Sequence, residues 1–353
     1  MGRIHWTMML IAALAASAAG AASAPHYRLE DLGALERGGQ SGASAINNRD
    51  EVVGYAVRHD RSSKPVRFVN GHAERVVARG NPAYHSGSAS AISDAGHITG
   101  TLFLGRRAGE SIFVTLDGAT SLFPLPNGIG AEATGVNSHG QVVGWQAPPQ
   151  QPHRAFLMHD GQWQDLPVPQ PGLPSYAYAI NDAGQVVGNH YRIIDGVNVQ
   201  FGALWQDGQL KESFGLPGSP YTHALAVNRQ GWVTGYSQVG RYLHQSHAYI
   251  HRDGVTTDLE THPAARSHAY GINAAGEVVG DRVAGRSAGG FLYSGGRMWW
   301  LADLLPAHQR AQWRLVLVHG INDAGHIVGV AQHPTRGLRA VMLRRLDEPP
   351  AQP

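Results

Sequence analysis

The chain repeats one pattern of hydrophobic and polar positions seven times. In each copy a small residue and a β-branched residue precede Asn (Ser in the second copy), a polar turn follows, and two β-branched residues and Gly end the segment. The Asn or Ser positions are spaced by 46, 44, 44, 47, 45 and 49 residues. A period of this length in a strand-rich sequence is typical of a solenoid or a propeller. The copies occupy residues 45–54, 91–100, 135–144, 179–188, 226–235, 271–280 and 320–329.

Each repeat predicts four short strands joined by turns. The first strand runs into the Ile/Val-Asn pair, and a turn follows in which Asn is the cap and Gly, or Asp50 in the first copy, takes the left-handed position. The second strand is the β-branched segment ending at Gly, and the third carries an aromatic or aliphatic cluster such as residues 155–157. Four antiparallel strands per repeat are typical of a propeller blade. Asn-Gly, Asp-Gly or Gly-Gly pairs predict the hairpins between third and fourth strands, at 70–71, 117–118, 160–161, 207–208, 253–254 and 295–296.

The two ends of the chain supply complementary parts of one blade. The seventh repeat has a third strand near Arg339–Leu343 and no fourth strand after it, whereas Tyr27–Leu32 precedes the first repeat and ends like a fourth strand. Pairing these segments removes two exposed sheet edges, while a solenoid would need a capping unit at each end. We therefore predict an all-β fold, a seven-bladed β-propeller of four-stranded blades, closed by the N-terminal strand completing the last blade. This domain covers residues 25–345, and we expect a disordered tail at 346–353.

Small residues take fixed places in the repeat. The residue two before the Asn or Ser is Ala or Gly in every copy, as at Ala179 and Gly271. The innermost strands of a propeller crowd round its axis, so small side chains belong there. The Gly ending each second strand, such as Gly188, predicts a bend or a close backbone approach.

The N-terminal segment predicts export. Arg3, an apolar run over residues 8–22 and the small residues 22–24 are typical of a secretory signal peptide, here residues 1–24. The run is interrupted and is shorter than the roughly 20 residues of a membrane helix, and no later stretch is apolar enough to span a bilayer. We expect an exported monomer, periplasmic or extracellular, with no membrane span.

Composition and motifs exclude several classes of chemistry. The chain has no Cys, which excludes disulfides, thiolate zinc sites and Cys nucleophiles. A net charge of +2 with interspersed charges gives no basic stripe, so we expect no nucleic-acid partner. There is no phosphate-loop, dinucleotide or His-Glu-x-x-His motif, and we expect no cofactor.

The Asn and Asp residues of the repeat turns at first suggest metal ligands. However, the Asp position is taken by other residues in four copies, and turns spread round a ring do not converge on one point as calcium ligands must. We therefore expect structural turns and no metal. The replacing residues are Asn48, Ser138, Arg229 and Ala274.

The repeat resembles that of the bacterial HAF-repeat proteins, described as probable extracellular repeat proteins. Their unit pairs a His-Ala-Phe strand with an Ile-Asn-Asp-Ala-Gly-Gln-Val-Val-Gly segment. The second half matches closely at 180–188 and well at 321–329, and the first half appears at 247–249 and, with an insertion, at 153–156. In other copies the first half departs from His-Ala-Phe, as at 291–293. The resemblance covers nearly the whole mature chain and implies export and a propeller-like β fold, but no agreed activity and no functional residues.

One variable position carries chemically capable side chains. Five residues before the Asn, at the entry to the inner strand, repeats three to six have Glu132, Tyr176, His223 and His268. The loops entering the inner strands surround one mouth of the axial channel, where ligands commonly bind. A carboxylate, a phenol and two imidazoles can bind a polar ligand or move protons, or they can simply line a wet channel. Loops on a regular scaffold commonly carry the functional residues. The loops predicted to reach the same mouth include 167–175, 215–222 and 302–313.

Three functions remain open. The first is a non-catalytic binding or scaffold module that engages a protein, glycan or surface polymer through the loop-rich face. The second is a secreted hydrolase or lyase with its active site at the channel mouth, because the fold alone does not decide between binding and catalysis. The third is a structural repeat without a specific ligand. The family resemblance favours the first, and the question of catalysis stays open.

Overall fold

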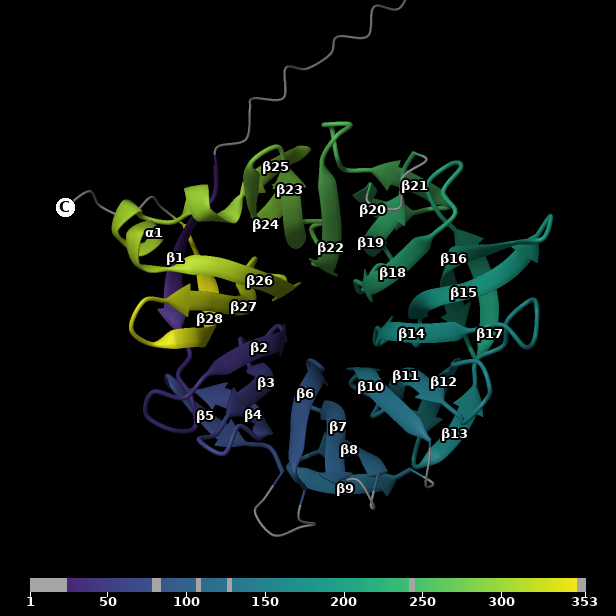
Figure 1. Cartoon of the computed structure of the whole chain (residues 1–353), viewed down its shortest axis with the longest axis horizontal. Helices are drawn as coiled ribbons and strands as arrows, with labels where there is room; N and C mark the ends of the chain where they lie inside the picture. The colour runs from purple at the N-terminus through teal and green to yellow at the C-terminus, as the bar shows by residue number, and fades with distance from the viewer. Residues whose placement is uncertain (1–23, 78–83, 106–108, 126–128, 241–244, 348–353) are drawn as a thin grey trace, which may run out of the picture.

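The chain forms a ring of seven four-stranded antiparallel sheets around a central axis (Figure 1). The computed structural model describes residues 24–77, 84–105, 109–125, 129–240 and 245–347. The predicted seven-bladed β-propeller is confirmed. Core clusters lie between neighbouring blades, because each sheet buries the apolar side chains of both of its faces.

In each blade the innermost strand comes first in the chain, except that the outermost strand of the last blade comes from the N-terminus. Blades 1 to 3 consist of β2 (Ser41–Ile46), β3 (Val52–Val57), β4 (Ser63–Val69), β5 (His72–Arg75); β6 (Ser86–Ile92), β7 (Ile98–Gly105), β8 (Gly109–Leu116), β9 (Ala119–Pro124); and β10 (Gly130–Val136), β11 (Val142–Ala147), β12 (Arg154–His159), β13 (Gln162–Asp165). Blades 4 and 5 consist of β14 (Ser175–Ile180), β15 (Val186–Ile194), β16 (Val197–Gln206), β17 (Gln209–Phe214); and β18 (Thr222–Val227), β19 (Val233–Gln238), β20 (Ser246–Arg252), β21 (Val255–Asp258). Blades 6 and 7 consist of β22 (Arg266–Ile272), β23 (Val278–Ala284), β24 (Ser287–Ser294), β25 (Arg297–Trp300); and β26 (Arg314–Ile321), β27 (Ile327–His333), β28 (Gly337–Leu346), β1 (His26–Asp31).

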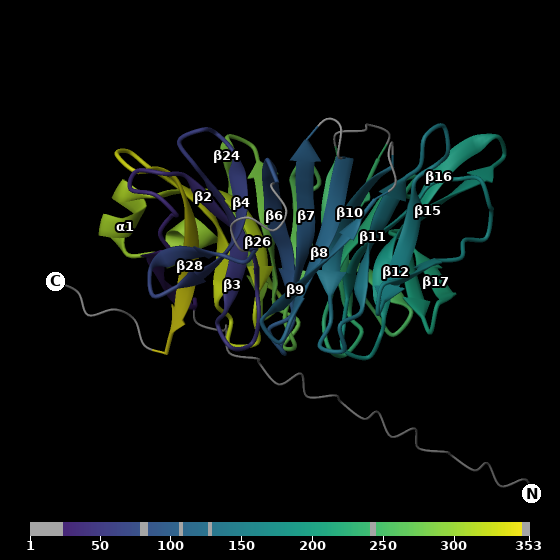
Figure 2. The ribbon, with the colours of Figure 1, turned by 90° about the horizontal axis from the view of Figure 1, so that it is seen from below.

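The ring has two different faces. One, the turn face, carries the Asn turns between first and second strands and the hairpins between third and fourth strands. The other, the loop face, carries the connections into the inner strands and the hairpins between second and third strands. It is uppermost in Figure 2, where the long β15–β16 hairpin projects from it. Figure 1 is viewed from the loop face.

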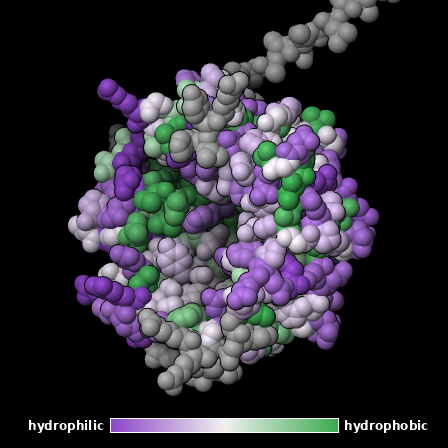
Figure 3. Space-filling view, turned by 45° about the vertical axis from the view of Figure 1, so that its right-hand side comes forward, coloured by the Kyte–Doolittle hydropathy of each residue, from purple (hydrophilic) through white to green (hydrophobic). Residues whose placement is uncertain are grey.

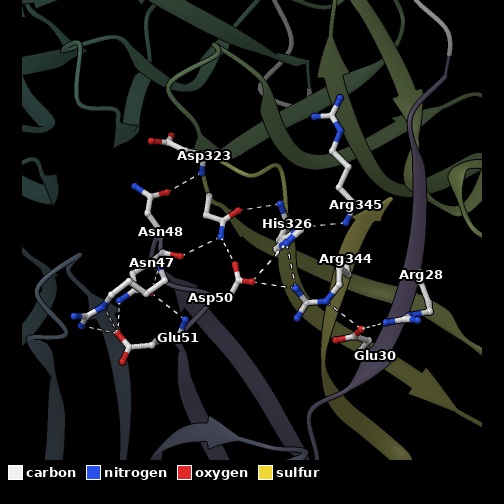
Figure 4. Close-up of polar contacts among 12 residues, drawn as sticks. Arg28, Glu30, Asn47, Asn48, Asp50, Glu51, Asp323, His326, Arg344 and Arg345 are labelled. Atoms are coloured by element: carbon white, nitrogen blue, oxygen red, sulfur yellow. Dashed lines mark hydrogen bonds and ion pairs between the residues drawn. The ribbon is translucent and has the colours of Figure 1, made fainter. Parts of the chain in front are cut away.

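The N-terminal strand closes the ring as predicted. β1 pairs antiparallel with β28 from His26 opposite Leu346 to Asp31 opposite Val341. Tyr27 is fully buried, and its hydroxyl donates to the carbonyl of Gly325 at 3.1 Å. A polar network, the seam, reinforces this junction on the turn face (Figure 4). In it Arg344 bridges Glu30 of β1 and Asp50 of blade 1, at 3.1 and 3.0 Å.

The segment predicted as a mouth loop at 302–313 has a different role. It forms η1 (Leu301–Leu304) and α1 (Ala307–Gln312), and it lies on the outside of the ring beside β1 (Figure 1). The Gln309 side chain accepts a hydrogen bond from the Leu29 N–H at 2.8 Å and donates to the Leu29 carbonyl at 3.0 Å. Leu301, Leu304 and Leu305 are buried against the same blade. Their apolar side chains draw the segment onto the core, where it covers the free edge of an outermost strand.

The Asn of the repeat turns has two roles, of which the sequence predicted one. Asn228 is typical: its Oδ1 accepts the N–H groups of Gln230 and Trp232 and so caps its own turn. Its Nδ2 donates to the carbonyl of the equivalent Asn in the next blade. This second bond, the latch, recurs at 2.9 to 3.2 Å for the pairs Asn47–Ser93, Asn137–Asn181, Asn181–Asn228, Asn228–Asn273, Asn273–Asn322 and Asn322–Asn47.

Blade 2 has Ser93 at this position, which is too short for the latch. There the ring nitrogen Nδ1 of His97, from the same turn, lies 3.3 Å from the Asn137 carbonyl. With this substitution the chain of contacts passes round the whole ring and back to Asn47.

The Gly ending each second strand makes the close approach that we predicted. A Cβ placed on Gly188 would lie 1.9 Å from the carbonyl oxygen of Tyr176 on the neighbouring strand, and the other six equivalents are as crowded, at 1.8 to 2.1 Å. The left-handed turn position is also confirmed, since φ is +74° at Gly184 and +61° at Asp50.

Parts of the terminal predictions lie outside the described residues. These are residues 1–23 of the predicted signal peptide and residues 348–353 of the predicted tail, while β28 continues through Leu346. In the part of the chain that the structure covers, no helix is long and apolar enough to cross a membrane.

Candidate binding site on the loop face

The four residues predicted at the channel mouth lie near the loop-face ends of their inner strands. Each faces a specific partner on the second strand of its own blade, and that partner directly follows the crowded Gly. Every inner strand also has a β-bulge further along, at which Tyr178 and Tyr270 are the extra residues in blades 4 and 6. The facing pairs are Glu132–Trp145, Tyr176–Asn189, His223–Tyr236 and His268–Asp281.

His223 and His268 come together around one tyrosine. The Tyr236 ring is stacked on His223 of its own blade with centroids 4.5 Å apart, and it packs on His268 of blade 6 at 4.0 Å. Aromatic rings in offset contact at such distances attract one another, so the three side chains form a rigid wall between blades 5 and 6.

This wall lines a cavity of about 460 Å³, the loop-face pocket. Figure 3 shows the loop face obliquely, with a hollow at its centre and hydrophobic residues gathered on one side of that hollow. No lining residue of the loop-face pocket is aliphatic or acidic. The lining residues are Tyr191, Gln200, Tyr221, His223, Tyr236, Gln238, Ser246, Arg266 and His268.

Several polar groups of the pocket are directed by protein contacts. His268 Nε2 and Ser246 Oγ are 2.6 Å apart, and His268 Nδ1 lies 3.4 Å from the Tyr270 hydroxyl. The Gln200 amide donates to the Thr222 carbonyl at 2.8 Å. Within the described ranges, the hydroxyls of three other lining residues make no hydrogen bond to protein, and these are Tyr191, Tyr221 and Tyr236.

Both imidazoles are uncharged at neutral pH. Burial, together with a smaller effect of the charge of His268, lowers the pKa of His223 to about 4. Burial also lowers the pKa of His268, against the opposing charge of Asp281 and with a smaller contribution from the charge of Arg266. A neutral imidazole has one donor and one acceptor nitrogen, so the pocket offers hydrogen bonds rather than positive charge at these two residues.

Tyr176 and Glu132 lie outside this pocket. The Tyr176 ring packs edge-on against Trp145 and His153 of blade 3, with centroids 5.8 and 5.4 Å apart, and therefore belongs to the packing between blades 3 and 4. Burial raises the pKa of the Glu132 carboxyl, and the charge of Glu110 in blade 2 raises it further. The structure thus brings two of the four predicted residues together in one pocket, places Tyr176 in the packing between blades 3 and 4, and leaves Glu132 exposed near the loop-face end of its inner strand.

Sequence reasoning missed most of the pocket, although part of the signal was present. Tyr236 occupies the position directly after the crowded Gly, which varies from blade to blade as freely as the inner-strand position opposite it. Because cross-strand neighbours share a sheet face, these two positions could have been read together. Tyr191, Gln200 and Arg266 had no such signal, because they reach the pocket through packing between blades.

The turns also line a cavity, at the axis on the turn face. It measures about 180 Å³, and its wall combines turn residues with the Ile or Val that precedes the Asn, or Ser93, in each of the seven blades. Arg229 of blade 5 reaches Asp323 of blade 7 there at 3.5 Å. The expectation that these turns do not converge is thus corrected, because their side chains share one space. Over the described residues, however, no three His, Asp or Glu side chains are grouped so as to hold a metal ion.

The sequence matches no protein-family model and no curated protein. Solved structures resemble the chain at low identity. The β-propeller domain of the Trilobed protease from Pyrococcus furiosus, described as having an open velcro topology, gives a TM-score of 0.56 at 12% identity over 93% of this chain and 100% of that one. YCF48 bound to D1 peptide gives 0.50 at 12% identity, with coverage of 92% and 100%.

A puromycin-hydrolyzing peptidase of Mycobacterium tuberculosis gives a TM-score of 0.52 at 12% identity over 94% of this chain. The chain spans only 57% of that peptidase. At such identities the likeness concerns the fold and not the site. The chain has the β-propeller fold that occurs both in peptidases and in a peptide-bound protein.

Proposed function

We propose that this protein is an exported, non-catalytic binding propeller that engages its ligand through the loop face. The HAF-repeat resemblance and the signal-peptide pattern support export. Binding in the loop-face pocket is supported by one observation above all: aromatic and polar side chains from three blades converge there, and three tyrosine hydroxyls have no protein partner in the described structure. Concave sites with a few converging polar groups are the usual places for ligands.

The proposal is tested by comparing variants on the two faces. Tyr221→Ala removes a side chain that lines the pocket and is only partly buried, whereas Arg229→Ala removes an exposed side chain of the turn face. Binding to immobilised oligosaccharides and peptides is measured by biolayer interferometry, with melting temperatures as the check on folding. We expect Tyr221→Ala to lose binding and Arg229→Ala to retain it. Equal binding by both variants would contradict a site in the loop-face pocket.

A second function, hydrolysis, is favoured by one contact. Ser246 Oγ lies 2.6 Å from His268 Nε2, which is the relation of a nucleophile to its general base. In that reaction Ser246 Oγ would add to a carbonyl carbon while its proton passes to His268, and His268 would give the proton to the leaving group. A water molecule, deprotonated by His268, would then release the acyl group and restore the Ser246 hydroxyl. Labelling by a fluorophosphonate that is abolished in Ser246→Ala would support hydrolysis. An unlabelled wild-type protein leaves the pair as a structural hydrogen bond between blades.

A further inference from the structure

We infer that the loop-face pocket binds an acidic saccharide, with a uronic carboxylate at Arg266 and the sugar hydroxyls at the neutral polar groups. This inference rests on the proposed binding function and adds the chemical class of the ligand. It uses the charge, the hydrogen-bonding groups and the shape of the lining.

Arg266 carries the charge of the pocket. The other lining side chains are tyrosines, glutamines, a serine and two neutral histidines. Across the described residues Arg266 forms no ion pair, and its side chain is exposed at the start of β22. Asp281, whose charge acts on His268, forms no ion pair with Arg266. A guanidinium presents two parallel N–H donors that fit a carboxylate, so an anionic ligand group would complete this site.

The neutral part of the lining fits a polyhydroxylated ligand. Three phenol hydroxyls, two carboxamides and a buried imidazole each donate or accept hydrogen bonds, as the hydroxyls of a sugar require. In the described structure the rings of Tyr191 and Tyr221 stack on no other aromatic ring, and both side chains are only partly buried, so each can present ring surface to the C–H face of a sugar. Such contacts let a pocket without aliphatic residues still bury apolar surface.

The same lining argues against a peptide. Peptide recognition depends on an open sheet edge or on hydrophobic sockets for anchor side chains. Each inner strand is paired on one side only and leaves an open edge toward the axis, but the pocket itself contains no Leu, Ile, Val, Met or Phe as an anchor socket. A peptide anchor would therefore meet only polar or aromatic-polar groups.

The test uses uronate probes with and without their charge. Tri-galacturonic acid, tri-mannuronic acid and a glucuronate-containing disaccharide are each compared with their methyl esters by isothermal titration calorimetry on the full-length mature protein. The esters keep the sugar hydroxyls and remove only the anionic group. We expect at least one acid to bind, and its ester to bind about ten to a hundred times more weakly, as for loss of a charged hydrogen bond. Binding of the acid should weaken with added salt.

Two arginines of blade 6 provide matched variants. Arg266→Gln removes the pocket guanidinium, while Arg286→Gln removes the same charge from the exposed β23–β24 hairpin on the same face, outside the pocket. We expect Arg266→Gln to bind acid and ester equally weakly, with an unchanged melting temperature, and Arg286→Gln to behave as wild type. Equal losses in both variants would mean non-specific charge attraction and overturn the inference.

The remaining outcomes separate this inference from the proposed function. If acid and ester bind equally and Tyr221→Ala abolishes both, the pocket binds saccharides but the acidic class is wrong. If no uronate binds while a peptide binds in a Tyr221-dependent manner, the saccharide class is wrong and the binding function stands. If Tyr221→Ala alters no binding at all, the pocket is not the site and both proposals fail.

Discussion

The job of a residue in this ring depends on its place in the repeat as much as on its type. Gly184 and Gly188 are four residues apart in the same blade. Gly184 is needed because its backbone is left-handed, whereas Gly188 is needed because a carbonyl oxygen occupies the space of a side chain. Glycine therefore has two separate physical causes here, and each makes its own prediction.

The crowded glycine should tolerate no side chain. In Gly188→Ala the new Cβ would overlap the Tyr176 carbonyl oxygen at 1.9 Å. Neither atom can turn aside, because the Cβ is fixed to its Cα and the oxygen belongs to the backbone of the paired strand. We expect a loss of about 3 kcal/mol in the free energy of unfolding, at the upper end for overpacking, measured by urea denaturation. Gly289→Ala is the control, because its nearest neighbour would lie at 4.0 Å. A similar loss in both variants would refute the steric explanation.

The left-handed glycine should matter more than the Asp beside it. Gly184→Val places a β-branched residue at φ +74°, which costs about 1–2 kcal/mol or more. Asp182 accepts the Ser138 N–H from the preceding blade at 2.8 Å, but this contact is exposed. We expect Asp182→Ala to cost about 1 kcal/mol or less. A greater loss of thermal stability in Asp182→Ala than in Gly184→Val would reopen a functional role for the turns.

At the scale of the element, the Asn turns join blades as well as strands. The cap is a local interaction within about five residues, so the sequence could predict it. The latch depends on where the next inner strand lies, and no local pattern contains that information. Ser93 illustrates this, because the loss of its amide looks like simple tolerance in the sequence, whereas in the structure His97 replaces the missing contact.

The two roles of Asn can be separated in blade 5. Asn228→Asp keeps the oxygen that accepts from Gln230 and Trp232 and removes the donor to the Asn273 carbonyl. We expect a loss of about 1–3 kcal/mol, because a buried carbonyl loses its partner and meets a carboxylate. The loss should shrink as the pH falls and the new carboxyl becomes protonated. Unchanged stability at neutral pH would show that the latch contributes nothing.

The strands and hairpins were predictable because their signals are local, and the site was predictable only in part. Type and place of the turns follow from Asn-Gly and Asp-Gly pairs whatever the tertiary structure. The inner-strand position of His223 and His268 was visible as a variable place in a regular repeat. Their meeting round Tyr236 was not, since it depends on the packing of blade 6 against blade 5. The same limitation explains why the position of 302–313 was predicted wrongly, because the sequence does not show which blade its buried leucines pack against.

At the scale of the whole molecule, closure links the first strand to every blade. β1 fills the outer edge of blade 7, and both Gln309 and Arg344 hold it from neighbouring elements. Deleting residues 25–33 should leave the edge of β28 unpaired, and the loss of the buried Tyr27 side chain should leave a cavity in the core. We therefore expect aggregation or a loss of several kcal/mol in the free energy of unfolding. Light scattering and thermal melting measure this. A deletion variant that melts like the wild type would contradict closure by β1.

The seam should also make the closed ring sensitive to acid. Burial lowers the pKa of His326, whose Nδ1 accepts the Arg345 N–H at 3.1 Å, while Asp50 and Glu30 oppose the shift and Arg344 and Arg345 add to it. Beside the seam, Glu277 of blade 6 forms an ion pair with Arg345 of β28 at 2.8 Å. Burial alone would raise the pKa of Glu277, but hydrogen bonds from Ser294 and Asn273 and the charge of Arg345 outweigh it, and the pKa is lowered. For both groups the folded pKa lies below the unfolded one. The unfolded chain therefore binds more protons in that interval, and stability is lost as the pH falls.

The pH range of this loss follows from the pKa values that His and Glu have in the unfolded chain. The loss should begin near pH 6.5, where an unfolded His becomes protonated, and continue below about 4.3, where an unfolded Glu does. His326→Gln places the residue found at this repeat position in Gln141 and Gln185. It should reduce the upper part of the dependence of the urea midpoint on pH, to which His223 and His268 still contribute, while leaving the lower part. His139→Gln, at an exposed turn residue of blade 3, should leave the profile unchanged. A His326→Gln profile identical to the wild type between pH 7.5 and 5.5 would show that acid acts on the ring elsewhere than at its seam.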